Sequence, residues 1–138
     1  MEIIDRYGVD HHLIEIELTE SEDFQNYEIM SGIIDEFKAN GIGTSIDDFG
    51  TGFSSLNMIK EVDLETIKID KSFIPLETDY PGKDRDLVMF HSIVQLINEL
   101  DKKSIAEGVE TVEQLEYLKG VGCDIVQGYV FDKPLPQE

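Results

Sequence analysis

Two neighbouring carboxylates, Asp47 and Asp48, end an apolar run and precede a glycine-rich stretch. Carboxylate oxygens are preferred ligands of Mg²⁺ and Mn²⁺, and two such ions close together assist the hydrolysis of phosphate esters. In a regular strand, adjacent side chains point to opposite faces. We expect Asp47 to be the last inward residue of a strand and Asp48 the first residue of a turn, which Gly50 and Gly52 permit. The alternative is an acidic turn without a function.

Polar residues also stand near the carboxyl ends of four further predicted strands: Glu17, Lys68, Glu107 and Gln127. Each has a simpler explanation on its own. Glu17 could be a solvated charge, Lys68 a surface lysine on an edge strand, and Gln127 a cap of the segment that follows. Their recurrence at corresponding positions favours one shared site. A lysine beside bound cations could orient an attacking water or help to deprotonate it.

The elements that must position these residues alternate along the chain. Strands are predicted for 13–18, 43–48, 65–70, 104–108 and 123–128. Helices are predicted for 21–41, 54–62, 86–102 and 111–122. The first of these helices has Ser21 as its expected N-cap and Gly41 as its stop; the second has a serine cap. The last opens with Thr111 and Gln114 in capping-box register.

This order indicates an α/β fold built from parallel βαβ units. The strands have one apolar face and one polar face, which favours a (β/α) barrel over a doubly wound sheet whose central strands are apolar on both faces. A complete barrel needs roughly 250 residues and eight strands. The 138 residues supply about five parallel strands. We therefore predict a single domain over residues 1–138, a partial TIM-like barrel whose first strands are missing.

Composition narrows the classes of partner. The net charge is −19, with only 11 lysines and arginines, which argues against polymeric nucleic acid as a ligand. Divalent cations could still bridge the protein to a small phosphorylated ligand. The single cysteine excludes an internal disulfide, and no apolar run or leader peptide is evident, so we expect a cytoplasmic protein. His11 and His12 are expected to be solvated loop residues.

Five segments together resemble the EAL domain family of bacterial cyclic di-GMP phosphodiesterases. They are ELTES (17–21), DDFGTGFSSL (47–56), IKIDKSFI (67–74), AEGVET (106–111) and QGYVFDKPLP (127–136). They occur in the family's order and at similar spacing. The resemblance implies a TIM-like barrel that hydrolyses cyclic di-GMP to the linear dinucleotide with two Mg²⁺ or Mn²⁺ ions.

The resemblance also implies roles for individual residues. The implied metal ligands are Glu17, Asp47, which would bridge both ions, Asp48 and Glu107, which would bind the second ion directly or through water. Lys68 would lie beside the attacking water. Gln127 would join the water network, and Glu110 would support the site.

Three further residues have implied roles around the site. Glu20 would steady the loop after Asp48, which in this family also takes part in dimer contacts. Phe131 and Pro134 would line a guanine pocket, whereas Tyr129 is expected in the core.

The sequence departs from the family pattern in two ways. The Glu-Ala-Leu tripeptide that names the family is absent, as is an Asn on the following strand, and both are ligands of the first metal. Both belong upstream of Met1. We therefore expect the parent protein to be an active phosphodiesterase and this 138-residue piece to be inactive or nearly so.

Other outcomes stay open at this point. A relative that binds cyclic di-GMP without cleaving it, as a receptor or interaction module, is the main alternative. An enolase-like lyase would explain the carboxylates but not the five segments together. Exposed sheet edges predict a homodimer or a strand-exchanged oligomer. A sensor or diguanylate cyclase domain fused upstream would fit the family, and such missing domains could tether the parent to a membrane.

Overall fold

The structure, a computed structural model, describes residues 2–19, 26–50, 55–75 and 80–134. Its contacts divide the chain into two compact units, Met1–Thr66 and Ile67–Glu138, which are described separately. The first unit holds α1 (Glu2–Tyr7), η1 (His11–Leu13), β1 (Glu15–Thr19), α2 (Tyr27–Ala39), β2 (Gly43–Phe49) and α3 (Ser55–Glu61). Strand β3 (Thr66–Ile69) begins at the last residue of this unit. The second unit continues with η2 (Lys71–Phe73), α4 (Lys83–Glu99), β4 (Lys103–Ala106), α5 (Val112–Gly120) and β5 (Ile125–Val126).

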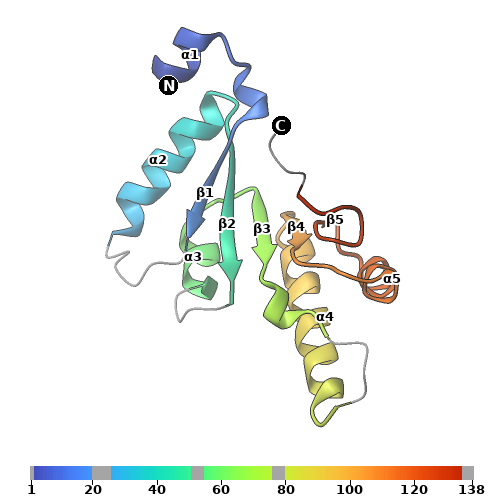
Figure 1. The fold of residues 1–138 in the computed structure, drawn as a ribbon. Coiled ribbons are helices and arrows are strands. Elements are labelled where there is room, and N and C mark those ends of the chain that lie inside the picture. The colour runs from blue at the N-terminus through green and yellow to red at the C-terminus, as the bar shows by residue number, and fades with distance from the viewer. Residues whose placement is uncertain (1, 20–25, 51–54, 76–79, 135–138) are drawn as a thin grey trace. The chain divides into compact units, whose positions relative to one another are not determined.

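In the first unit β1 and β2 form a parallel pair, with α2 running alongside it (Figure 1). Exposed and half-buried residues alternate along β1, as predicted, because only one face of the strand has apolar side chains. β2 is buried through Thr44, Ser45 and Ile46. The apolar core of this unit comes from α2, the turn before β2, β2, α3 and the loop after α3: Met30, Ile34, Ile42, Ile46, Phe49, Met58, Val62 and Leu64.

Helix α2 begins later than the sequence indicates. Its N-cap is Asn26, whose side chain accepts a hydrogen bond from the N–H of Ile29, so the expected helix start at Ser21 is wrong. Ser21 itself lies outside the described residues. The predicted stop at Gly41 is confirmed, since its φ is +76°. A Cβ at Gly41 would also lie 2.8 Å from the His12 ring, so the neighbouring turn requires glycine as well.

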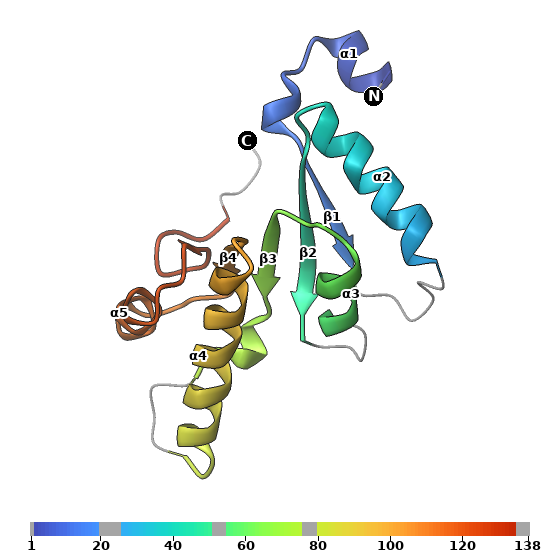
Figure 2. The ribbon, with the colours of Figure 1, turned by 180° about the vertical axis from the view of Figure 1, so that it is seen from behind.

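In the second unit the strand order is β3-β4-β5, and β4 pairs with β5 in parallel. Helix α4 packs against β4 through a buried face (Figure 2). The buried apolar residues of this unit are Ile67, Ile69, Ile74, Phe90, Val94, Ile97, Ala106, Val109 and Leu118.

Two boundaries of α4 differ from the prediction. The helix starts at Lys83 rather than Asp86, because Gly82 adopts a φ of +103° and serves as the N-cap. It ends at Glu99 rather than at residue 102, and Asp101 then takes a left-handed conformation with φ +54°. In α5 the predicted capping box of Thr111 and Gln114 is confirmed.

The prediction of parallel strands alternating with helices is confirmed, with five strands in the part of the chain that the structure describes. The predicted boundaries of the strands were less accurate than the predicted order of the elements. β5 has only two residues, and β1 starts at Glu15 because His11–Leu13 form a 3₁₀ turn capped by Asp10. Among the described residues, no helix has the length and apolar character required to cross a bilayer.

Candidate functional site

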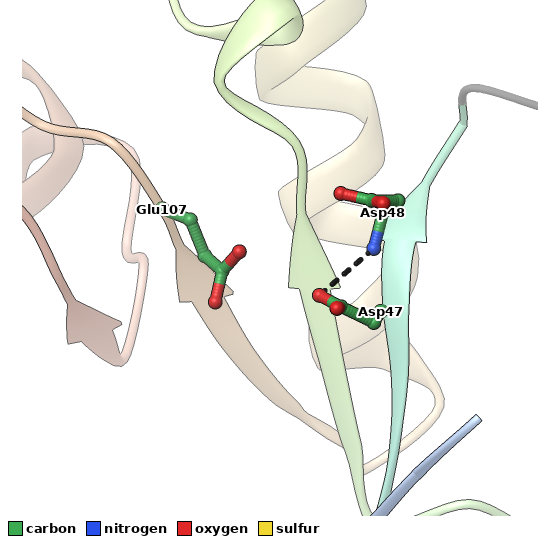
Figure 3. Close-up of side chains that lie close together, drawn as sticks. All are labelled: Asp47, Asp48 and Glu107. Carbon is green, nitrogen blue, oxygen red and sulfur yellow. Dashed lines mark hydrogen bonds between the residues drawn. The ribbon is translucent and has the colours of Figure 1, made fainter. Parts of the chain in front are cut away.

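Asp47 and Asp48 both lie within β2, and the backbone between them turns their side chains toward one region (Figure 3). Asp48 has a φ of +53°, which is the left-handed conformation. The turn therefore begins at Asp48 itself, inside the strand, and not only at Gly50, whose φ is +98°. As a result, a carboxylate oxygen of Asp47 and one of Asp48 lie within 4.8 Å of each other. The two aspartates can serve one site.

The main chain also orients Asp47. The backbone N–H of Asp48 donates a hydrogen bond to Oδ1 of Asp47 over 3.0 Å. Asp47 is half-buried whereas Asp48 is exposed. Two carboxylates at this separation repel each other, and a divalent cation removes that repulsion. The donors are carboxylate oxygens, which suit Mg²⁺ or Mn²⁺ and not a metal that prefers thiolates.

Strand β1 contributes a third carboxylate on the same face. Glu17 pairs with Ser45, and Thr19 pairs with Asp47, in the parallel register. Paired residues share a face of the sheet, and Ser45 shares its face with Asp47, two residues further along β2. Glu17 therefore lies on the same face as Asp47, beside Ser45. The buried Ser45 hydroxyl donates to Oε1 of Glu15 over 2.9 Å, which ties the two strands together on this polar face. No local pattern in the sequence signals this bond, because its partners lie 30 residues apart.

The second unit places a lysine against a glutamate. Lys68, on β3, is only 8% exposed, and its Nζ lies 2.8 Å from Oε1 of Glu107. This burial excludes the alternative of an ordinary surface lysine. Glu107 follows β4 directly, and its N–H donates to the carbonyl of Ile69 over 3.2 Å. Figure 3 draws Glu107 at the end of its strand. The unit thus holds a cationic and an anionic group together at the ends of two strands.

Glu110 and Gln127 lie on the surface beside these strand ends. The N–H of Glu110 donates to the Gln114 side chain over 2.9 Å, within the N-terminal cap of α5. The N–H of Gln127 donates to the carbonyl of Ala106, and its own carbonyl accepts from the N–H of Val109. The main chain of Gln127 therefore orders the segment that carries Glu107.

The other residues with a predicted place are in the C-terminal segment, apart from Glu20. Phe131 is 65% exposed and Pro134 is exposed, so both are accessible to a ligand. Tyr129 is 53% exposed, so its expected place in the core is wrong. Its ring instead lies 5.7 Å from Nζ of Lys133, a cation–π contact at the surface. Glu20 lies outside the described residues.

Asp70 is a further residue, at the end of β3, and its role was not predicted from the sequence. Its side chain accepts from the N–H of Ser72 over 2.9 Å and caps η2, directly after the strand of Lys68. Burial acts to raise the pKa of this carboxyl, but hydrogen bonds from Ser72 and from the backbone of Lys71 outweigh it, and the pKa is lowered. An aspartate two residues before a serine is a sequence signal for such a turn.

Comparison with known proteins gives a consistent result. The sequence matches the family model of the EAL domain over residues 1–134. It is 37% identical over 133 residues to cyclic di-GMP phosphodiesterase NbdA of Pseudomonas aeruginosa, covering 96% of this chain and 17% of that protein. It is also similar to solved structures. For the PaMucR phosphodiesterase in complex with c-di-GMP, the TM-score is 0.83 at 36% identity, with 98% of this chain and 53% of that chain covered.

A third relative was solved with a metal. The manganese and cy-diGMP complex of Klebsiella pneumoniae BlrP1 has a TM-score of 0.80 at 26% identity, covering 96% of this chain and 33% of that one. The chain thus spans about half or less of these relatives' lengths. The family match, in contrast, covers nearly every residue of this chain. The chain therefore belongs to the EAL domain family.

Proposed function

We propose that this chain is the part of a cyclic di-GMP phosphodiesterase that holds most of its metal-binding carboxylates. The observation that carries the proposal is the pair of Asp47 and Asp48, whose carboxylate oxygens lie within 4.8 Å because Asp48 is left-handed. The relatives NbdA and PaMucR are named as phosphodiesterases, and the substrate class is taken from them. On this proposal the product is the linear dinucleotide.

The proposed cofactor is a pair of Mg²⁺ or Mn²⁺ ions, supported by the oxygen-only donors and by the manganese complex of BlrP1. Their proposed ligands are Glu17, Asp47, Asp48 and Glu107. When bound, such ions would neutralise charge on the phosphodiester and lower the pKa of a nearby water. Asp47, held by the Asp48 N–H, is the proposed bridging ligand.

The remaining site residues are proposed to orient the reactants. Lys68 would donate a hydrogen bond to the attacking water, and Glu107 would fix its Nζ through the 2.8 Å ion pair. Gln127 and Glu110 would support the water network from the adjoining segment. This role fits Lys68 because its ammonium is a hydrogen-bond donor held in a buried position beside a carboxylate.

Three further residues complete the proposal. Glu20 would steady the loop after Asp48. Phe131 and Pro134 would contact a guanine base, for which the exposed ring of Phe131 offers a stacking surface.

The proposal requires further ligands from outside these 138 residues. The tripeptide Glu-Ala-Leu does not occur in the sequence, and the family resemblance assigns it and a following Asn to the first metal. We therefore propose that the chain acts within a whole EAL domain and hydrolyses little or nothing alone. We also propose a cytoplasmic site of action, one domain over residues 1–138, and association into a homodimer or strand-exchanged oligomer.

Hydrolysis of cyclic di-GMP by a protein that carries these residues within a whole EAL domain tests the proposal. With Mn²⁺ present, we expect the linear dinucleotide as product. The Asp47→Asn variant is expected to give no product, whereas Asp35→Asn, a carboxylate change on the exposed surface of α2, should retain activity. Binding of cyclic di-GMP without product in the unaltered protein would overturn the enzyme assignment and favour a receptor.

A further inference from the structure

Helix α1 has almost no packing of its own. It has six residues, none of which is buried, and Ile3 and Tyr7 are each 74% exposed. A helix this short is not stable through its backbone hydrogen bonds alone. Its place in the first unit therefore depends on specific contacts.

His11 supplies such a contact, contrary to the expectation of a solvated loop residue. Its side chain, in the 3₁₀ turn η1, is 21% exposed and bonds in two directions. Nδ1 lies 2.9 Å from the carbonyl oxygen of Asn40, the C-cap of α2. Nε2 lies 2.8 Å from Oδ1 of Asp5 on α1. The ring thus joins α1 to the end of α2.

Both partners of the His11 ring are hydrogen-bond acceptors. A backbone carbonyl and a carboxylate can only accept, and a neutral imidazole has only one N–H to donate. Both bonds can form together only when the ring carries two protons. The positive ring then also faces the C-terminal end of α2, where unpaired carbonyls favour a cation.

We propose that His11 is a proton-dependent clasp, which holds α1 against the C-terminal end of α2 when its ring carries two protons and releases α1 when it carries one. The proposal is independent of the proposed enzymatic function. It concerns α1 and η1, the segment that precedes β1, the strand that carries Glu17.

The groups around His11 support this direction. The bond to the Asn40 carbonyl and then the bond to Asp5 raise its pKa above the ordinary 6.5, while burial and the positive charge of the amino terminus oppose them. On η1, Asp10 bonds the N–H of His12, and the His12 ring lies against Gly41. In the last turn of α2, the charge of Lys38 is paired with Asp63.

The sign of the pH dependence follows. Because the folded pKa of His11 is raised, the clasp is complete below pH 6.5 and is lost as the pH rises through the folded value. Release is therefore expected on the alkaline side, in the range where histidine ordinarily responds to cellular pH.

Nuclear magnetic resonance of the 138-residue chain tests the clasp. Ring ¹⁵N shifts of His11 should give a titration midpoint above 6.5, and Asp5→Asn should lower it. Glu2→Gln, the matched control, also removes a carboxylate from α1 but should leave the midpoint unchanged. Backbone ¹⁵N relaxation of α1 should change from ordered values near about pH 5.5 to mobile values near about pH 8.5.

Two results would overturn the proposal. One is a His11 midpoint that is the same in the unaltered chain and in Asp5→Asn. The other is α1 relaxation that does not change with pH while His11 titrates. His11→Gln provides a second check, since its α1 should be mobile at both pH values, and an ordered α1 in that variant would also contradict the clasp.

Discussion

The two units position their charged residues by different physical means. In the first unit, two like charges are brought together by the main chain, through the left-handed Asp48 and its N–H bond to Asp47. In the second unit, opposite charges hold each other, since Lys68 and Glu107 form an ion pair at 2.8 Å. The first arrangement has electrostatic repulsion built in and the second does not.

This difference indicates that the two units have different roles. Backbone geometry holds Asp47 and Asp48 together, through the left-handed Asp48 and its N–H bond to Asp47, as the proposed metal site requires. The ion pair instead fixes the position of a buried ammonium beside a carboxylate. The first unit therefore supplies most of the proposed metal-binding carboxylates, and the second combines Glu107 with the lysine proposed to orient a reactant.

The largest expected effect concerns metal binding. Asp47→Asn in a whole EAL domain should lower Mn²⁺ affinity by at least about 100-fold, because it removes a carboxylate where even the loss of supporting residues costs 10–100-fold. Calorimetric titration with Mn²⁺ measures this. Asp35→Asn serves as the control in the same unit, and equal affinities in the two variants would show that Asp47 does not bind metal.

The ion pair of the second unit should matter for folding. Glu107→Gln is expected to lower the free energy of unfolding by about 2 kcal/mol, the usual value for a hydrogen bond between charged groups. Urea denaturation at neutral pH measures it. The matched control is Glu116→Gln, which removes an exposed pair with Lys119 and should cost about 0.5 kcal/mol or less. Equal losses would contradict a special role for the buried pair.

The left-handed backbone at Asp48 gives a prediction for the first unit. Asp48→Gly should be more stable than Asp48→Val by about 1–2 kcal/mol, because a left-handed conformation is costly for any residue with a Cβ and especially for a branched one. Thermal or urea unfolding of both variants measures the difference. At Thr19, which has no positive φ, the order should reverse, with valine more stable than glycine. The same order of stabilities at both positions would contradict a left-handed conformation at Asp48.

The smallest expected effect is at Asp70. Asp70→Ala removes the cap of η2 and should cost about 1 kcal/mol at neutral pH. Because the folded pKa of Asp70 is lowered, its contribution is present above 3.8 and is lost as the pH falls through the folded value. Urea unfolding at neutral and acidic pH measures this, and a cost that persists in acid would contradict it.

The sequence was sufficient to predict the order of elements, because the alternation of apolar and polar residues in β1 and β3 and the capping box of α5 are local signals. It was also sufficient to place Glu17, Asp47 and Lys68 on strands and Glu107 at the end of one. Their family roles came from resemblance, and these stay predictions.

Other features depend on which of several possible caps, backbone conformations or distant partners prevails, and a local sequence pattern does not show this. Two residues could cap α2, and Asn26 rather than Ser21 caps it. Asp48 was expected to follow the strand, yet it adopts a positive φ within it, which a short polar side chain tolerates. The clasp of His11 needs Asn40 from 29 residues away, a distance at which local periodicity gives no information.

The central claim is that the carboxylates of the first unit, together with Glu107, bind the metal ions and that the lysine of the second unit acts on the reactant. It is tested by measuring Mn²⁺ binding and cyclic di-GMP hydrolysis on the same samples of a whole EAL domain. We expect Asp47→Asn to lose both, and Lys68→Met to retain Mn²⁺ binding while losing hydrolysis. Loss of Mn²⁺ binding in Lys68→Met to the same degree as in Asp47→Asn, or full hydrolysis in either variant, would contradict the claim.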